Sequence, residues 1–147
     1  MSDHPADRVH SLMYVSRRRV SPPLDDGDID HLVEGAQVFN SEHAVTGALI
    51  ATHLFFAQHI EGPESVIAAL IDRIRIDPRH YDVRVISQAQ NAARLFAEWA
   101  MAYRGTARYF DRDIEPAIDG SAKSDQHSRR LLAHMIESER YERLKIR

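Results

Sequence analysis

The sequence contains no cysteine, which excludes disulfide bonds, thiolate metal ligands and cysteine nucleophiles. It has no apolar run of membrane-spanning length, and its polar start, MSDHPADR, is unlike a signal peptide. The net charge is −3, whereas a dedicated nucleic-acid binder shows a basic face. These absences predict a cytoplasmic protein that engages neither membranes nor nucleic acids.

Familiar enzyme motifs are missing as well. The chain has no phosphate-binding loop, no GxSxG and no HExxH. None of its nine histidines combines with carboxylates in a convincing metal-ligand arrangement. The sequence therefore predicts neither an enzyme nor a metal site.

What is present is a chain of ordinary globular composition. It has 147 residues, of which 44% are hydrophobic and 28% charged, so we expect one domain with a substantial core. Alternating and helical apolar patterns predict its elements in order. They are a strand at 10–17, a helix at 28–40, strands at 45–52 and 54–61, a helix from 63 that ends before Pro78, strands at 81–89 and 94–103, and a helix at 124–143.

This order, β-α-β-β-α-β-β followed by a helix, predicts an α+β fold (an α/β sandwich). Its first six elements match the ferredoxin-like pattern of split βαβ units. We expect a five-stranded mixed sheet with a C-terminal helix added.

Three polar residues lie where apolar packing is expected. Gln58 shares a strand face with Phe56 and Ile60, and a buried amide without partners costs about 1–3 kcal/mol. Tyr14 shares a strand face with Leu12, and its hydroxyl needs a partner if it is buried. Asn40 ends the apolar stripe of the first helix, where it is either a helix terminus or a ligand-binding residue.

A fourth polar feature is RIRIDPRH, which contains Arg73, Asp77 and His80. The ordinary interpretation is an i, i+4 ion pair on the helix surface, between Arg73 and Asp77, with a histidine near the helix end. The functional interpretation is a set of donors and an acceptor for a polar ligand. Taken alone, the motif favours the ordinary interpretation.

Taken together, five segments resemble the BLUF family of blue-light sensors, which bind flavin non-covalently. They are MYVS, NSEHAVTGALI, FFAQHIEG, RIRIDPRH and RLFAEWAM, in the family's order and approximate spacing over residues 9–104. The resemblance implies a ferredoxin-like sheet with two helices on one face and the flavin held between those helices.

The resemblance also implies a role for each unusual residue. The cofactor would be FAD, with FMN or riboflavin as substitutes, held by Asn40, Arg73, Asp77 and His80. In the family, the tyrosine matched by Tyr14 gives an electron and a proton to the excited flavin, and the glutamine matched by Gln58 relays the proton and reorients. Trp99 and Met101 match the last-strand pair that carries the signal outward.

Three positions depart from the family pattern. Ala36 stands where many members have serine, Phe39 replaces a polar residue before the helix asparagine, and His59 follows the glutamine on what we expect to be an outward-facing position. The first two departures support a second hypothesis, in which the chain has a BLUF-like fold without flavin and serves as a protein interaction module. A third hypothesis is a small ferredoxin-like hydrolase that uses Arg73 and His80, although the sequence offers no convincing nucleophile.

The resemblance divides the chain into three parts. We expect a disordered N-terminus at 1–8, a flavin-binding domain at 9–104, and a helical extension at 105–147 that packs on the sheet or on a partner. The implied partner is a downstream signalling protein, and a homo-oligomer is compatible with the apolar stripe of the last helix.

Overall fold

The structure is a computed structural model that describes residues 8–19, 26–91, 93–97, 102–104, 110–119 and 124–145. The N-terminal segment expected to be disordered lies outside these residues, apart from Arg8. The elements are β1 (Val9–Arg18), α1 (Asp26–Glu42), β2 (Thr46–Ala51), β3 (Phe55–Gly62), α2 (Glu64–Arg75), β4 (His80–Asn91), β5 (Ala102–Arg104), α3 (Asp111–Asp119) and α4 (Ser124–Lys145).

The strands form one sheet in the order β4-β1-β3-β2-β5. The first four pair antiparallel, whereas the three-residue β5 runs parallel to β2. The predicted α+β class is confirmed, and β2 and β3 form a tight antiparallel hairpin. Because β1, β3 and β2 are the inner strands, their side chains are buried on both sides of the sheet.

The last predicted strand differs most from the structure. The sequence predicts a strand over 94–103, but residues 93–97 form bends and a turn instead. The backbone N–H groups of Leu95 and Phe96 donate to the buried carboxylate of Glu61, at 3.0 and 2.9 Å. A side chain distant in sequence therefore takes the donors that a regular strand would offer to its neighbour.

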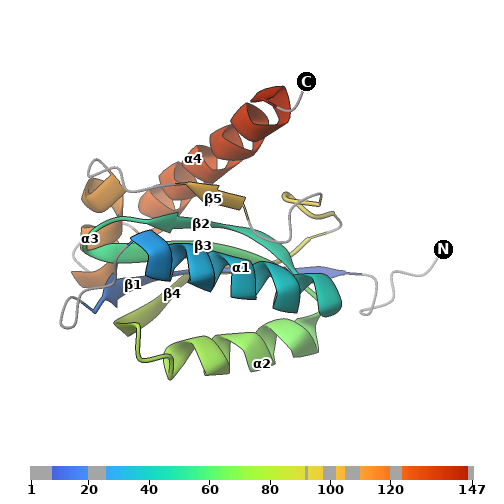
Figure 1. Cartoon of the computed structure of the whole chain (residues 1–147), viewed down its shortest axis with the longest axis horizontal. Helices are drawn as coiled ribbons and strands as arrows, with labels where there is room; N and C mark the ends of the chain where they lie inside the picture. The colour runs from blue at the N-terminus through green and yellow to red at the C-terminus, as the bar shows by residue number, and fades with distance from the viewer. Residues whose placement is uncertain are drawn as a thin grey trace.

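Helices cover both faces of the sheet, with α1 and α2 on one side and α3 and α4 on the other (Figure 1). We call these the α1/α2 face and the α3/α4 face. Because strand side chains alternate, each face has its own core. On the α1/α2 face, the sheet contributes Leu12, Tyr14, Leu49, Phe56 and Ile60; on the α3/α4 face, it contributes Met13, Val15, Ala48, Ile50, Phe55 and Ala57.

Helix α3 lies in the polar stretch between residues 103 and 124, for which the sequence pattern predicts no separate helix. Pro116 lies inside the helix and reads as a helix breaker in the sequence. The apolar residues Ile114, Ala117 and Ile118 nevertheless recur at helical spacing, and all three are buried against the sheet. Their burial stabilises a helix that local propensity does not predict.

The pairing of β1 with β4 contains a bulge beside Tyr14. Met13 pairs with Ser87, but the next residue, Tyr14, pairs with Val85, so Ile86 is an extra residue on β4. Val85 packs on the α1/α2 face and Ile86 on the α3/α4 face. Bulges of this kind often occur beside functional sites, where they redirect side chains.

Among the described residues, no helix combines the length and apolar character needed to cross a membrane.

Candidate functional site

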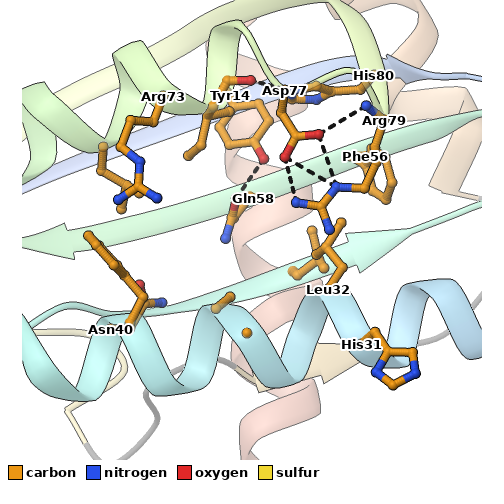
Figure 2. Close-up of a pocket in the computed structure, with 16 residues that line it drawn as sticks. Tyr14, His31, Leu32, Asn40, Phe56, Gln58, Arg73, Asp77, Arg79 and His80 are labelled. Atoms are coloured by element: carbon orange, nitrogen blue, oxygen red, sulfur yellow. Dashed lines mark hydrogen bonds and ion pairs between the residues drawn. The ribbon is translucent and has the colours of Figure 1, made fainter.

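A cavity of about 250 Å³ lies between α1 and α2 above the sheet. Figure 2 shows the two helices on opposite sides of it, with Tyr14 and Gln58 between them. The sheet forms its floor with Tyr14, Leu49, Phe56 and Gln58. The remaining lining residues come from α1, from α2 with the turn after it, and from the start of β4: His31, Leu32, Gly35, Ala36, Phe39, Asn40, Leu70, Arg73, Ile74, Asp77, Arg79 and His80.

Tyr14 and Gln58 are directly opposite each other on β1 and β3. The Tyr14 hydroxyl donates a hydrogen bond to Gln58 Oε1 at 2.5 Å. The two residues are 4% and 7% exposed, so each provides the other with a polar contact in an otherwise apolar floor. The structure thus identifies a partner for the inward-facing amide that the sequence singles out.

Burial keeps Tyr14 in its protonated form. Desolvation raises the pKa of its phenol far above the ordinary value, and the nearby carboxylate of Asp77 raises it further, against an opposing effect of Arg79. Loss of the phenolic proton to water is therefore strongly disfavoured. A proton leaving Tyr14 would move along the hydrogen bond to Gln58.

His80, at the start of β4, is held by two protein groups. Ring atom Nε2 lies 2.5 Å from the carbonyl oxygen of Ile74, and Nδ1 lies 2.7 Å from the hydroxyl of Ser16. Because a carbonyl can only accept, Nε2 carries the proton and Nδ1 accepts from serine. Burial is the largest influence on the pKa of His80 and lowers it, which favours this neutral ring.

The ring of His80 also supports the cavity floor. It meets the rings of Tyr14 and Phe56 edge-on, with centroid distances of 6.0 Å in both cases. Both ring nitrogens bind protein atoms, so His80 is arranged to position these two aromatic residues.

Asp77 pairs with Arg79 instead of Arg73. Helix α2 ends at Arg75, so Asp77 lies beyond the helical surface on which the i, i+4 ion pair was expected. Its carboxylate accepts from the Arg79 backbone N–H at 2.9 Å and from the Arg79 guanidinium. Burial would raise the pKa of Asp77, but these bonds and the charge of Arg79 outweigh it, and the pKa is lowered.

Arg73 points from α2 across the cavity toward α1 (Figure 2). Its guanidinium carbon lies 4.8 Å from the centre of the Phe39 ring, a cation–π geometry, and Phe39 stacks on His43 at 4.0 Å. Phe39 and Arg73 thus form one side of the cavity from opposite helices.

Asn40 and the small residues of α1 form the facing wall. Asn40 is buried, and its backbone carbonyl accepts the N–H of Val45, which fixes the turn from α1 into β2. A Cβ added to Gly35 would meet no atom within 4 Å, so the wall is open at this point. Ala36 extends this open stretch along the cavity.

The structure brings six of the residues singled out in the sequence around one cavity: Tyr14, Asn40, Gln58, Arg73, Asp77 and His80. Trp99 and Met101 lie outside the described residues. Arg79 was not singled out in the sequence, because its pairing with Asp77 depends on α2 ending at Arg75. Among the described residues, no group of three or more histidine, aspartate or glutamate side chains could hold a metal ion.

The expectation that His59 faces outward was wrong, because its side chain is shielded from solvent. It is buried on the α3/α4 face, where its ring lies 5.3 Å from that of Phe96 and its Nε2–H donates to Glu61 at 3.1 Å. The second layer of helices covers a strand face that a two-layer sandwich would leave exposed.

Comparison with known proteins gives a consistent result. A sequence model described as sensors of blue light using FAD, the BLUF family, matches residues 9–102. The photoactivated adenylate cyclase subunit beta of Euglena gracilis is 32% identical over 92 residues, which are 62% of this chain and 10% of that protein. The chain thus spans about a tenth of the length of this curated relative.

Solved structures match over more of the chain. BlrB, a BLUF protein in its dark state, is 27% identical with a TM-score of 0.71, covering 90% of this chain and 98% of that one. BlrP1 of Klebsiella pneumoniae, in a complex with calcium and cyclic diGMP, is 32% identical with a TM-score of 0.62 over 66% of this chain and 24% of that one.

Proposed function

Because the chain belongs to the BLUF family of blue-light sensors, we propose that it is a blue-light photoreceptor that binds FAD non-covalently between α1 and α2. The observation that carries this proposal is the hydrogen bond from Tyr14 to Gln58, at 2.5 Å on the floor of the cavity. It joins the two residues that match the photochemical pair of the family.

The cavity offers suitable contacts for a flavin ring. Its size, about 250 Å³, is just below the roughly 300–1,000 Å³ range of small-molecule sites, which suits one flat ring system better than a whole dinucleotide. Apolar side chains of Leu49 and Leu70 line it, as a planar aromatic ring requires. Because only the ring would need to be enclosed, FMN or riboflavin could replace FAD.

Polar contacts would come from both helices. We propose that Asn40 holds the polar edge of the ring from α1, while Arg73 and the paired Asp77 and Arg79 hold the more polar parts of the cofactor from the α2 side. His80 lies at the same cavity but binds Ser16 and Ile74. We therefore assign it a positioning role beneath Tyr14.

Bound FAD would supply visible absorption and an excited state that oxidises a nearby phenol. The chain supplies the phenol of Tyr14 and a proton acceptor in Gln58. Burial disfavours both the phenolate anion and the phenol radical cation of Tyr14. Loss of an electron from Tyr14 would therefore be coupled to movement of its proton toward Gln58 Oε1.

Gln58 has the properties of a two-position switch. In the orientation described, its carbonyl oxygen accepts from Tyr14, so its NH₂ group points elsewhere. Rotation of the amide would instead present its NH₂ group as a donor to the Tyr14 oxygen, and tautomerisation would place an O–H donor there. Either change would alter the group that Gln58 presents to the cavity. Both ends of the amide have nearly the same shape, so the switch requires little repacking.

We propose that the domain at 9–104 senses light and that the extension at 105–147 transmits the signal to a protein partner. The described parts of the extension, α3 and α4, pack on the sheet face opposite the cavity. We propose no enzymatic activity for this chain. Trp99 and Met101 remain proposed signal residues from their match to the family.

The test is a visible spectrum of the purified protein, recorded in darkness and after blue light. We expect bound flavin and a small, reversible red shift. The Gln58→Leu variant should keep the colour and lose the shift, because leucine can neither accept from Tyr14 nor reorient. A colourless protein that takes up no added FAD would contradict the proposal and favour a flavin-free interaction module.

A further inference from the structure

Glu61 is a fully buried carboxylate at the end of β3, three residues after Gln58. It accepts hydrogen bonds from the hydroxyl of Thr46 at 2.8 Å and from the ring of His59 at 3.1 Å. It also accepts from the backbone N–H groups of Leu95 and Phe96, at 3.0 and 2.9 Å. One side chain thus ties β2, β3 and the segment after β4 together.

Burial would raise the pKa of Glu61, but the bonds from His59, Phe96, Leu95 and Thr46 outweigh it and lower the pKa. The group is therefore a carboxylate at neutral pH. A buried carboxylate separated from its donors is strongly unfavourable, so these donors and Glu61 should move as a unit.

Arg94 makes a second connection from the same segment. One of its terminal nitrogens, Nη2, donates to the carbonyl of Ala44 at 2.6 Å, and the other, Nη1, lies 3.0 Å from Thr46 Oγ1 and 3.3 Å from the Glu61 carbonyl. Ala44 has φ 58° in the turn after α1, four residues beyond Asn40. Arg94 therefore connects the segment to the turn that follows α1, the helix that forms one wall of the cavity.

Phe96 faces the opposite layer of the molecule. Its side chain is 0% exposed and belongs to the core formed with Ile114 of α3 and with Leu131 and Met135 of α4. Residues 94–96 consequently contact β3, which carries Gln58, and the turn after α1 on one side, and α3 and α4 on the other.

We propose that residues 94–96, held by Glu61 and Arg94, form a latch that transmits the light-induced change at the cavity to α3 and α4. This inference rests on the proposed photoreceptor function. Displacement of β3 or of the turn after α1 would move the backbone at Leu95 and Phe96, because their N–H groups remain bound to Glu61. The Phe96 ring would then shift within the core beneath α3 and α4.

Glu61 and Arg94 are positioning residues in this proposal, because neither lines the cavity. Their role is thus separable from flavin binding. A variant that weakens the latch should leave the photochemistry of Tyr14 and Gln58 in place and disconnect the helices from it.

The test is hydrogen–deuterium exchange of the FAD-loaded full chain, followed by mass spectrometry, in darkness and under blue light. In the unmodified protein we expect light to change exchange in residues 93–97, α3 and α4. In Glu61→Gln, and independently in Arg94→Lys, we expect the red shift to remain while the light–dark difference in α3 and α4 is lost. Arg75→Lys is the matched control, since Arg75 bonds the Val83 carbonyl outside the latch.

Retention of the full light–dark difference in both latch variants would overturn the proposal, and so would its absence in an unmodified protein that shows the red shift. An unmodified protein with no bound flavin or no shift would instead refute the photoreceptor function, and the latch with it. If Glu61→Gln fails to fold, Arg94→Lys decides, because it retains the charge and removes only the forked contact. In darkness, hydrogen–deuterium exchange in Arg94→Lys should equal that of the unmodified protein. A difference that is lost only under light then reflects transmission, whereas altered exchange in darkness would indicate a purely structural role.

Discussion

On strand β3, Phe56 and Gln58 face a cavity, whereas Phe55 and His59 face a filled core. The two faces of one sheet thus serve different purposes. The α1/α2 face leaves a cavity, and its polar lining residues come from the sheet, from α1, and from α2 with the turn after it. The α3/α4 face buries Phe96, Phe110 and Ile114 completely. The α3/α4 face is therefore closely packed, so that a displacement of Phe96 would be passed on to the helices that cover it.

The largest expected effect comes from truncating a phenylalanine to alanine on each of the two faces. Phe96→Ala removes a fully buried ring from the α3/α4 face and should lower the free energy of unfolding by about 3–5 kcal/mol. Phe39→Ala removes a half-buried ring beside the cavity and should cost about 1 kcal/mol or less. Urea unfolding measures both values. Equal losses would show that the faces do not differ in packing as described.

The next prediction concerns a substitution that fills the cavity on the α1/α2 face. Gly35→Phe places a large side chain on the cavity wall, where an added Cβ meets no atom within 4 Å. We expect FAD affinity to fall about a hundredfold or more, equivalent to about 2.7 kcal/mol. Flavin titration measures it, with Gly35→Ala as the control that should still bind. A yellow Gly35→Phe protein with unchanged affinity would place the flavin elsewhere.

A smaller effect is expected from the support beneath Tyr14. Ser16→Ala removes the donor to His80 Nδ1 and leaves that buried nitrogen without its partner, at a cost of about 1–3 kcal/mol. Because His80 holds the edges of Tyr14 and Phe56, the absorption of bound flavin should shift slightly as well. Thermal unfolding and the dark spectrum test this. An unchanged melting temperature would show that Ser16 contributes nothing to the site.

The smallest effect is a pH dependence. The pKa of Glu61 is lowered from 4.5, so its contribution to stability is fully present above pH 4.5 and is lost as the pH falls through the folded-state pKa. The pKa of Asp77 is also lowered. Asp77 lies on the more open α1/α2 face and is partly exposed, so solvent screening weakens its contribution to stability. Glu61→Gln should therefore flatten the acid side of the stability profile more than Asp77→Asn does. Equal profiles would contradict this difference.

Much of the fold follows from local pattern. The alternation in HSLMYVSR and LFFAQHIE placed β1 and β3, and their pairing sets Tyr14 opposite Gln58. The remainder depends on distant contacts. The turn at 93–97 exists because Glu61 binds its backbone, and α3 forms in spite of Pro116 because Ile114 and Ile118 are buried.

The same distinction applies to the site. Asn40 and Gln58 could be singled out because they are polar residues on apolar faces. The pairing of Asp77 with Arg79 could not, because it depends on α2 ending at Arg75, before the helical surface reaches Asp77. Helix boundaries are among the least certain features of a sequence-based prediction.

The bulge beside Tyr14 has a consequence for how β4 can change in length. In a regular strand, losing or gaining one residue turns every following side chain to the other face. Here Ile86 is already supernumerary, with Val85 opposite Tyr14 and Ser87 opposite Met13. Deleting Ile86 would therefore restore continuous pairing without exchanging the faces of its neighbours. A single-residue insertion or deletion in β4 is thus best accommodated at Ile86, beside Tyr14 of β1.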